Sequence, residues 1–415
     1  MISRDADRRY TFLVALCVAV AFAACGGGGN GTSDSTTGGD TATPGGNPTS
    51  KTRTSTPTQH ATQGLQGTPT PTSTPTPTSS IIVSNGGDIV RAVRNAPPGS
   101  TVYIAPGIYP PFTLGASDVQ GPIILVADVS GTISGSGAGP VIIDATYGDS
   151  PAVAAITLSG IPQGSAVVID SFTLRGGTGA GITVDGSPGT IIENCTFESN
   201  PGDGVSFTAS NGSLLFNNLL FNNSGAGVRA LGTDGLWVFN NTIYNNTGTG
   251  IAIGSDQDAS PDAVVENNII NSNGSFGIAV AANSTGGYHG DYNLNSDGYA
   301  AGTPPGPDDI TADLSAMSLF ISPTATPPDL HLAPGSPAVG AGDPATLADL
   351  GNLLQNQVGV LSSLQSGTTQ TDGTLDCQFA DLGYHYRVDQ ICGVPTPTPT
   401  AAPTRSKKKT ATPTP

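Results

Sequence analysis

The stretch from Ile169 to Ile278 decides the fold, because it repeats with a period of 23 residues. Its segments IDSFTLRGGTGAGI, IENCTFESNPGDGV, LFNNLLFNNSGAGV, VFNNTIYNNTGTGI and VENNIINSNGSFGI start at Ile169, Ile192, Leu215, Val238 and Val265. The spacing between the last two is 27 residues. Apolar residues recur in fixed columns, one of which is Leu174, Phe197, Leu220, Ile243 and Ile270, and a glycine precedes a second apolar column in every segment.

One such segment cannot bury its apolar side chains alone, whereas stacked turns about 4.8 Å apart share a continuous core and pair their strands. Asparagine suits the corners, because it tolerates left-handed backbone angles and its amide can bond to the amide one turn away. Two asparagine columns recur, Asn194, Asn217, Asn240, Asn267 and Asn200, Asn223, Asn246, Asn273. We interpret them as structural. Cys195 stands where later segments have asparagine, so we expect a core residue and not a nucleophile.

These repeats resemble the right-handed parallel β-helix proteins, the superfamily that includes the pectate lyases, over Ile81 to Asn295. The resemblance implies an all-β solenoid with an N-terminal capping helix and a C-terminal capping segment, flanked by disordered tails. Residues 89–109 look like the capping helix and first strand, and residues 318–344 and 380–386 look like a segment that covers the bottom of the last turn. A leucine-rich repeat has a similar period, but helix-forming residues are absent here.

The ends of the chain differ in composition from the repeats. Residues 1–25 are typical of a lipoprotein signal peptide, with arginines before an apolar run and Cys25 in a sequence that resembles a lipobox; an ordinary secretory signal is the alternative. We expect a disordered stalk over 26–80, a parallel β-helix over 81–300, C-terminal turns and a cap over 301–393, and a disordered tail over 394–415. These segments predict an exported monomer, an outer-membrane or cell-surface lipoprotein that touches the membrane only through its lipid.

The net charge and the positions of the lysines and cysteines restrict the classes of function that the sequence supports. The net charge is −17, which disfavours binding to nucleic acid. No lysine lies between residues 81 and 393, so an anionic polymer would need divalent cations to be held there. In an exported protein we expect Cys377 and Cys392 to form a disulfide. The sequence does not place the insertion over residues 345–376.

The resemblance also implies where a sugar would bind, which is the outer face of the first strand of each turn and the loops around it. On that face Thr183, Asp185, Ser206 and Asp203 are candidate substrate-binding residues. Arg229 is the candidate catalytic base of a uronate lyase, and Asp203, Asp256 and Asp258 are candidate ligands for Ca²⁺. The partner would be a polysaccharide or a cell-surface glycan.

A non-catalytic function is the alternative, either a surface adhesin or a structural solenoid. The tether, the shortage of basic residues and loops of Ser, Thr, Gly and Asn favour it. Phe221, Tyr244 and Phe239 could stack on sugar rings or pack against neighbouring turns. Sequence alone leaves open whether the protein cleaves a glycan or only binds it.

Overall fold

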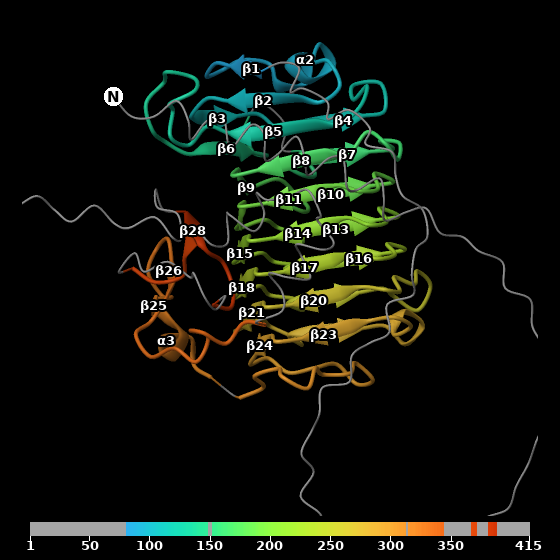
Figure 1. Ribbon diagram of the computed structural model, residues 1–415, viewed down its shortest axis with the longest axis vertical. Coiled ribbons are helices and arrows are strands. Elements are labelled where there is room, and N and C mark those ends of the chain that lie inside the picture. The colour runs from blue at the N-terminus through green and yellow to red at the C-terminus, as the bar shows by residue number, and fades with distance from the viewer. Residues whose placement is uncertain (1–79, 148–151, 313, 344–366, 372–380, 388–415) are drawn as a thin grey trace, which may run out of the picture. The chain divides into compact units, whose positions relative to one another are not determined.

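Three parallel sheets wind around one core in a computed structural model that describes residues 80–147, 152–312, 314–343, 367–371 and 381–387 (Figure 1). Sheet A consists of β1 (Ser80–Val83), β2 (Ser100–Ile104), β5 (Ile123–Ala127), β8 (Val167–Asp170), β11 (Ile191–Glu193), β14 (Leu214–Phe216), β17 (Trp237–Phe239), β20 (Val264–Glu266) and β23 (His289–Asp291). Its nine strands correspond to about nine turns of a parallel β-solenoid.

The other two sheets complete each turn. Sheet B consists of β3 (Gly107–Tyr109), β6 (Val141–Asp144), β9 (Thr173–Arg175), β12 (Thr196–Glu198), β15 (Leu219–Phe221), β18 (Thr242–Tyr244), β21 (Ile269–Asn271) and β24 (Leu294–Asn295). Sheet C consists of β4 (Phe112–Gly115), β7 (Ile156–Ser159), β10 (Ile182–Asp185), β13 (Val205–Thr208), β16 (Val228–Leu231), β19 (Ile251–Ile253) and β22 (Ile278–Val280). Along the chain, a turn therefore passes from sheet C to sheet A and then to sheet B.

The strand register confirms the predicted columns. Phe197 pairs with Leu174 on one side and with Leu220 on the other, and the column continues to Ile243 and Ile270. All five side chains are fully buried in the main core. The 27-residue segment keeps this register, because its extra residues lie in the loop between β19 and β20.

Two ladders of buried asparagine side chains run along the solenoid, each linking equivalent positions of successive turns. The column denotes this stack of turns. In the first, Asn223 Nδ2 donates to Asn246 Oδ1 at 2.8 Å and Asn246 Nδ2 donates to Asn273 Oδ1 at 2.9 Å. The ladder ends at Asp297, whose Oδ2 accepts from Asn273 Nδ2 at 2.8 Å. The second ladder runs through Asn218, Asn241, Asn268 and Asn293 and ends at Asp309.

Cys195 occupies the first position of the second ladder. Its backbone N–H donates to Asn218 Oδ1 at 2.8 Å, and its side chain is fully buried. Burial raises the pKa of the Cys195 thiol well above its usual value. The prediction that this cysteine is a core residue is confirmed.

The asparagines that join sheets A and B adopt the left-handed conformation that their sequence position predicts, with φ of 52° at Asn217 and Asn240 and 58° at Asn267. All three also bind a later part of the chain. Asn217 Oδ1 accepts from His385 N at 2.6 Å, Asn240 Nδ2 donates to Asp381 O at 3.3 Å, and Asn267 Oδ1 accepts from Asp343 N at 2.9 Å. These three asparagines therefore both turn the chain between sheets A and B and bind the C-terminal segment.

A short helix, α2 (Ile89–Arg94), lies at the N-terminal end of the column. Asp88 caps the N-terminus of this helix, since its Oδ1 accepts a hydrogen bond from Arg91 N at 2.9 Å. Ile89 and Val93 are buried in the main core. Its action as a cap stays a prediction. Among the described residues, no helix has the length and apolar composition needed to cross a bilayer.

The C-terminal segment lies against the side of the column and not across its bottom. It contains α3 (Ala316–Leu319), β25 (Phe320–Ser322), β26 (Asp329–Leu332), β27 (Gly367–Thr368) and β28 (Tyr386–Arg387). Leu319, Phe320 and Leu382 form one cluster with Phe221 and Tyr244, whose side chains point outward from sheet B. The prediction that residues 318–344 and 380–386 cover the bottom is wrong for the described part of these segments, because this apolar flank binds them instead.

Several expectations lie outside the described residues. They are the signal peptide with Cys25, nearly all of the stalk over 26–80, the disulfide between Cys377 and Cys392, and the tail over 394–415.

Candidate functional site

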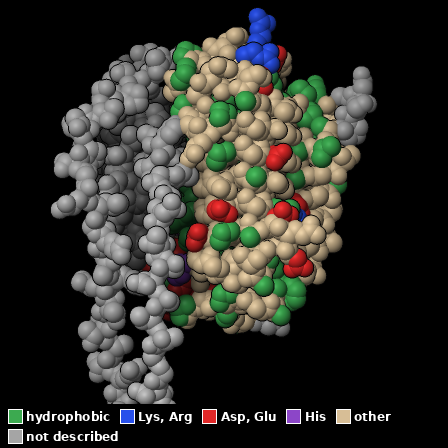
Figure 2. Space-filling view, turned by 90° about the vertical axis from the view of Figure 1, so that its right-hand side faces the viewer, with side chains coloured by type: hydrophobic (Ala, Val, Ile, Leu, Met, Phe, Trp, Pro, Cys, Tyr) green, Lys and Arg blue, Asp and Glu red, His purple; other side chains and the backbone are tan. Residues whose placement is uncertain are grey.

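The outer face of sheet C carries one straight column of side chains. It runs through Thr113, Thr157, Thr183, Ser206, Arg229, Ala252 and Ala279, each paired in register with the next. The alternation of the strands places this column outside, because its neighbours such as Ile182 and Val184 are buried in the core. On the turns before Arg229 the side chains of this column carry hydroxyl groups, and on the two turns after it they are alanines. Figure 2 shows this side of the molecule, where Asp and Glu are scattered and Lys and Arg are few.

Arg229 and Asp203 form an ion pair on this face. Arg229 Nε lies 2.7 Å from Asp203 Oδ2, and Nη2 lies 3.1 Å from Oδ1. Asp203 Oδ1 also accepts from Ala226 N at 2.7 Å. The hydrogen bond to Asp203 is the main reason that the pKa of the half-buried Arg229 rises above its usual value. The structure thus brings together two predicted site residues, and it holds the guanidinium as a cation.

The remaining predicted residues are spread over the same side. Asp185 lies at the end of β10, two residues after Thr183, and pairs in register with Thr208. Asp258 lies in the loop between β19 and β20, where its N–H donates to Ser255 Oγ at 3.0 Å. Among the residues that the structure describes, no three His, Cys, Asp or Glu side chains are placed to hold a metal ion. The structure therefore does not gather Asp203, Asp256 and Asp258 into a calcium site.

Phe276 is a candidate that the sequence analysis missed. Its side chain is 46% exposed, whereas the other phenylalanines that the structure describes are buried. It occupies the position before the repeated glycine, where the other turns have Ala180, Asp203, Ala226 and Thr249. The Asp203–Arg229 pair shows that a side chain from this position reaches the outer column of sheet C. The signal was an aromatic residue at a position otherwise small or polar.

The three aromatic residues considered for sugar stacking are all buried. Phe221 and Tyr244 lie beneath the C-terminal segment. Phe239 stacks on Phe216 with ring centroids 5.2 Å apart and planes 10° apart. Of the two interpretations open in the sequence, packing accounts for them.

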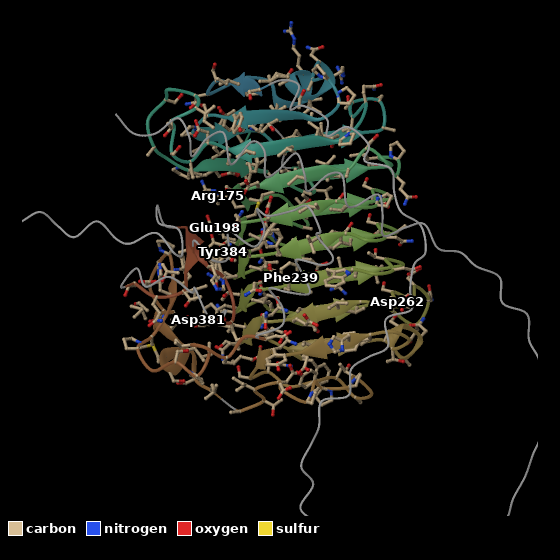
Figure 3. All side chains as sticks on the ribbon, viewed as in Figure 1. Arg175, Glu198, Phe239, Asp262, Asp381 and Tyr384 are labelled. Carbon is tan, nitrogen blue, oxygen red and sulfur yellow. The ribbon has the colours of Figure 1, made fainter. Side chains whose placement is uncertain are left out.

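Arg175 lies on sheet B and not beside Arg229, as its position in the repeat predicts. Its Nε lies 3.0 Å from Asp144 Oδ2 and its Nη1 3.6 Å from Glu198 Oε1. Figure 3 shows Arg175 and Glu198 together on the side of the column opposite Asp262. Both flanking carboxylates compensate its charge, so it forms a separate cluster.

Comparison with known proteins supports the fold. Residues 160–300 match the family model described as "Right handed beta helix region". No curated protein is similar to this chain by sequence.

Among solved structures, the chain is similar to a variant of the periplasmic alginate epimerase AlgG (15% identity, 47% of this chain and 45% of that chain, TM-score 0.36). It is also similar to pectate lyase Pel9A (13% identity, 64% and 91%, TM-score 0.40). A third is the A-module of the mannuronan C-5 epimerase AlgE4 from Azotobacter vinelandii (18% identity, 44% and 65%, TM-score 0.26). The chain spans about half the length of the AlgG epimerase. Residues 160–300 are therefore similar to the right-handed β-helix family, and they lie within a longer parallel β-solenoid.

Proposed function

We propose that this protein is exported, anchored to a membrane through a lipid on Cys25, and binds a polysaccharide or cell-surface glycan along the outer face of sheet C without cleaving it. The observation that carries the proposal is the exposed ring of Phe276 at the edge of a face of hydroxyl groups and small side chains. Apolar faces of sugar rings pack against exposed aromatic rings, and hydroxyl groups exchange hydrogen bonds with serine and threonine.

The dimensions of the face suit a linear ligand. Successive side chains of the column are about 4.8 Å apart, so the three turns from Ser206 to Ala279 span about 14 Å. Ala252 and Ala279 have small side chains that would admit a sugar ring on this face, while Thr183 and Ser206, on the preceding turns of the same column, would supply polar contacts to the rest of the chain of sugars. Arg229 lies between the hydroxyl side chains and the alanines of this column. It is the one basic residue of the column, and Asp203 neutralises its charge.

Binding is favoured over a lyase reaction by the state of Arg229. A base must accept the C5 proton of a uronate, but this guanidinium is protonated and engaged by both oxygens of Asp203. We expect no unsaturated product when the protein is incubated with polyuronates and calcium. Calcium-dependent product that disappears in Arg229→Ala would establish a lyase and overturn the non-catalytic proposal.

The Phe276→Ala variant is expected to bind the glycan about ten-fold more weakly, since stacking of this kind contributes roughly 1 kcal/mol. Affinity electrophoresis through a panel of neutral and acidic polysaccharides identifies the ligand and gives the ratio. Met317→Ala is the control, because Met317 is also a large exposed apolar side chain but lies in α3 on the opposite flank. Equal binding by the wild type and Phe276→Ala would exclude this face.

The Cys25→Ser variant is expected to leave the membrane fraction and lose incorporation of radiolabelled fatty acid in a bacterial host. An acyl chain binds a bilayer by about 0.8 kcal/mol per buried CH₂, so removing it removes the anchor. Cys17→Ser, within the apolar run of the signal, is the matched control. Membrane association that persists in Cys25→Ser would show that another element anchors the protein.

A further inference from the structure

The charge of the outer face of sheet C depends on the surroundings of Arg229. Among the described residues, the other arginines lie elsewhere, namely Arg91 and Arg94 in α2, Arg175 in β9 and Arg387 in β28. No lysine lies between residues 81 and 393. A ligand on this face that carries negative charge would therefore depend on the guanidinium of Arg229 for its attraction.

Asp203 occupies the edge of this guanidinium that a carboxylate of a ligand would bind. A planar guanidinium holds a carboxylate best through two parallel N–H···O bonds. In Arg229 these two donors are Nε and Nη2, and they already bind Asp203 Oδ2 at 2.7 Å and Oδ1 at 3.1 Å. Asp203 is fixed in turn, because its Oδ1 accepts from Ala226 N and its side chain is only 14% exposed. A carboxylate of a ligand would have to displace one that the fold holds in place.

A neutral ligand meets no such competition. The side chain of Arg229 is 41% exposed, and its remaining N–H groups can donate to hydroxyl oxygens. Ser206, which pairs in register with Arg229, adds a hydroxyl group that both donates and accepts. The polar part of this face therefore suits the hydroxyl groups of a sugar better than a carboxylate.

Exposed carboxylates follow the strands of sheet C and add to this preference. Asp185 is the last residue of β10, Asp234 lies in the loop after β16, and Asp258 lies in the loop after β19. All three are exposed, and Figure 2 shows Asp and Glu side chains scattered over this side of the molecule. Negative charges along a binding face repel an anionic polymer and reduce its rate of association.

We propose that the outer face of sheet C selects neutral polysaccharides over acidic ones, and that Asp203 determines this specificity by occupying Arg229. The inference rests on the proposed glycan-binding function and adds the class of sugar. A purely structural role for Asp203, in which the ion pair only joins two adjacent turns, makes a different prediction. Removal of the pair would then change stability but not the ratio of the affinities for neutral and acidic ligands.

Matched polymers measure this ratio. Polygalacturonate and polymannuronate are each compared with their carboxyl-reduced, neutral forms by surface plasmon resonance of the full chain over the immobilised polymers. EDTA in the buffer prevents divalent cations from bridging carboxylates. The wild type is expected to bind at least one reduced polymer about five-fold more tightly than its acidic parent.

Asp203→Asn is expected to bind the acidic parent about five-fold more tightly than the wild type does. Asparagine keeps an oxygen that can accept from Ala226 N, but it has no charge with which to hold Arg229. The double variant Asp203→Asn/Arg229→Gln is expected to lose this gain. Asp234→Asn is the matched control, because it removes the same charge from the exposed loop after β16, and its ratio is expected to stay near that of the wild type.

Arg229→Gln decides the matter if Asp203→Asn fails to fold, because it leaves Asp203 as an unpaired carboxylate and should raise the preference for the neutral form. An unchanged ratio in a folded variant of the ion pair, or an equal gain in Asp234→Asn, would overturn the inference. A wild type that binds acidic and reduced polymers equally well would also overturn it, while the proposed glycan binding would stand. Absence of binding to every neutral and acidic polymer tested would overturn both.

Discussion

Asn246→Ala is expected to lower the free energy of unfolding by about 3–5 kcal/mol, although it removes only one small polar side chain. Asn246 Oδ1 accepts from the backbone N–H of Asn223 at 3.0 Å and from its Nδ2 at 2.8 Å. Asn246 Nδ2 donates to Asn273 Oδ1 and to Leu220 O. Alanine leaves the buried backbone N–H of Asn223 without this partner, which costs about 1–3 kcal/mol. The other three lost hydrogen bonds each cost about 0.5–1.5 kcal/mol, although Asn223 Nδ2 keeps its bond to Phe197 O and Asn273 Oδ1 keeps its bond from the Asn246 backbone. Urea denaturation followed by circular dichroism measures the loss.

The neighbouring residue supplies the control. Asn245 is exposed and has a φ of 52°, so Asn245→Gly keeps the backbone conformation and is expected to change stability by less than about 1 kcal/mol. Similar losses in the two variants would mean that the buried ladder contributes no more than an exposed corner.

Phe197→Ala is expected to lower the free energy of unfolding by about 3–5 kcal/mol, as truncation of a buried phenylalanine commonly does. Phe197 is fully buried, and β12 is paired on both sides, with β9 and with β15. Because these pairings hold the strands of adjacent turns in place, the cavity has little freedom to collapse. Thermal denaturation monitored at several wavelengths gives the change.

Phe276→Ala is the matched control for this variant, since it removes the same ring from an exposed site and should leave stability unchanged while weakening glycan binding. A Phe197→Ala protein as stable as the wild type would mean that the ring does not belong to a core shared between turns.

The repeated part of the fold was predictable because each turn presents the same physical problem. A column such as Leu174, Phe197 and Leu220 can be read from spacing alone, since parallel pairing in register follows from equal segment lengths. The side on which the C-terminal segment lies was not predictable. Its binding surface is made of residues such as Phe221 and Tyr244, which look the same in the sequence whether they stack on a ligand or are covered by another segment.

The candidate site was predictable in part for the same reason. Arg229 and Asp203 meet because they occupy corresponding edges of adjacent turns. The predicted calcium ligands did not come together, since Asp256 and Asp258 belong to an inserted loop whose path the repeat does not specify. Phe276 was missed because the repeat reveals which residues share a column but not how much of a loop side chain stays exposed.

The two buried asparagine ladders have a consequence for how such a protein can grow. A carboxylate lacks the N–H groups with which an amide donates to the next turn, so Asp297 and Asp309, which accept from Asn273 and Asn293, close the ladders at the C-terminal end. Duplication of a 23-residue unit between Asn223 and Asn246 would lengthen the molecule while leaving both closures intact. Extension beyond Asp297 would instead require its replacement by asparagine, which means that new copies are most easily accommodated in the interior of the gene.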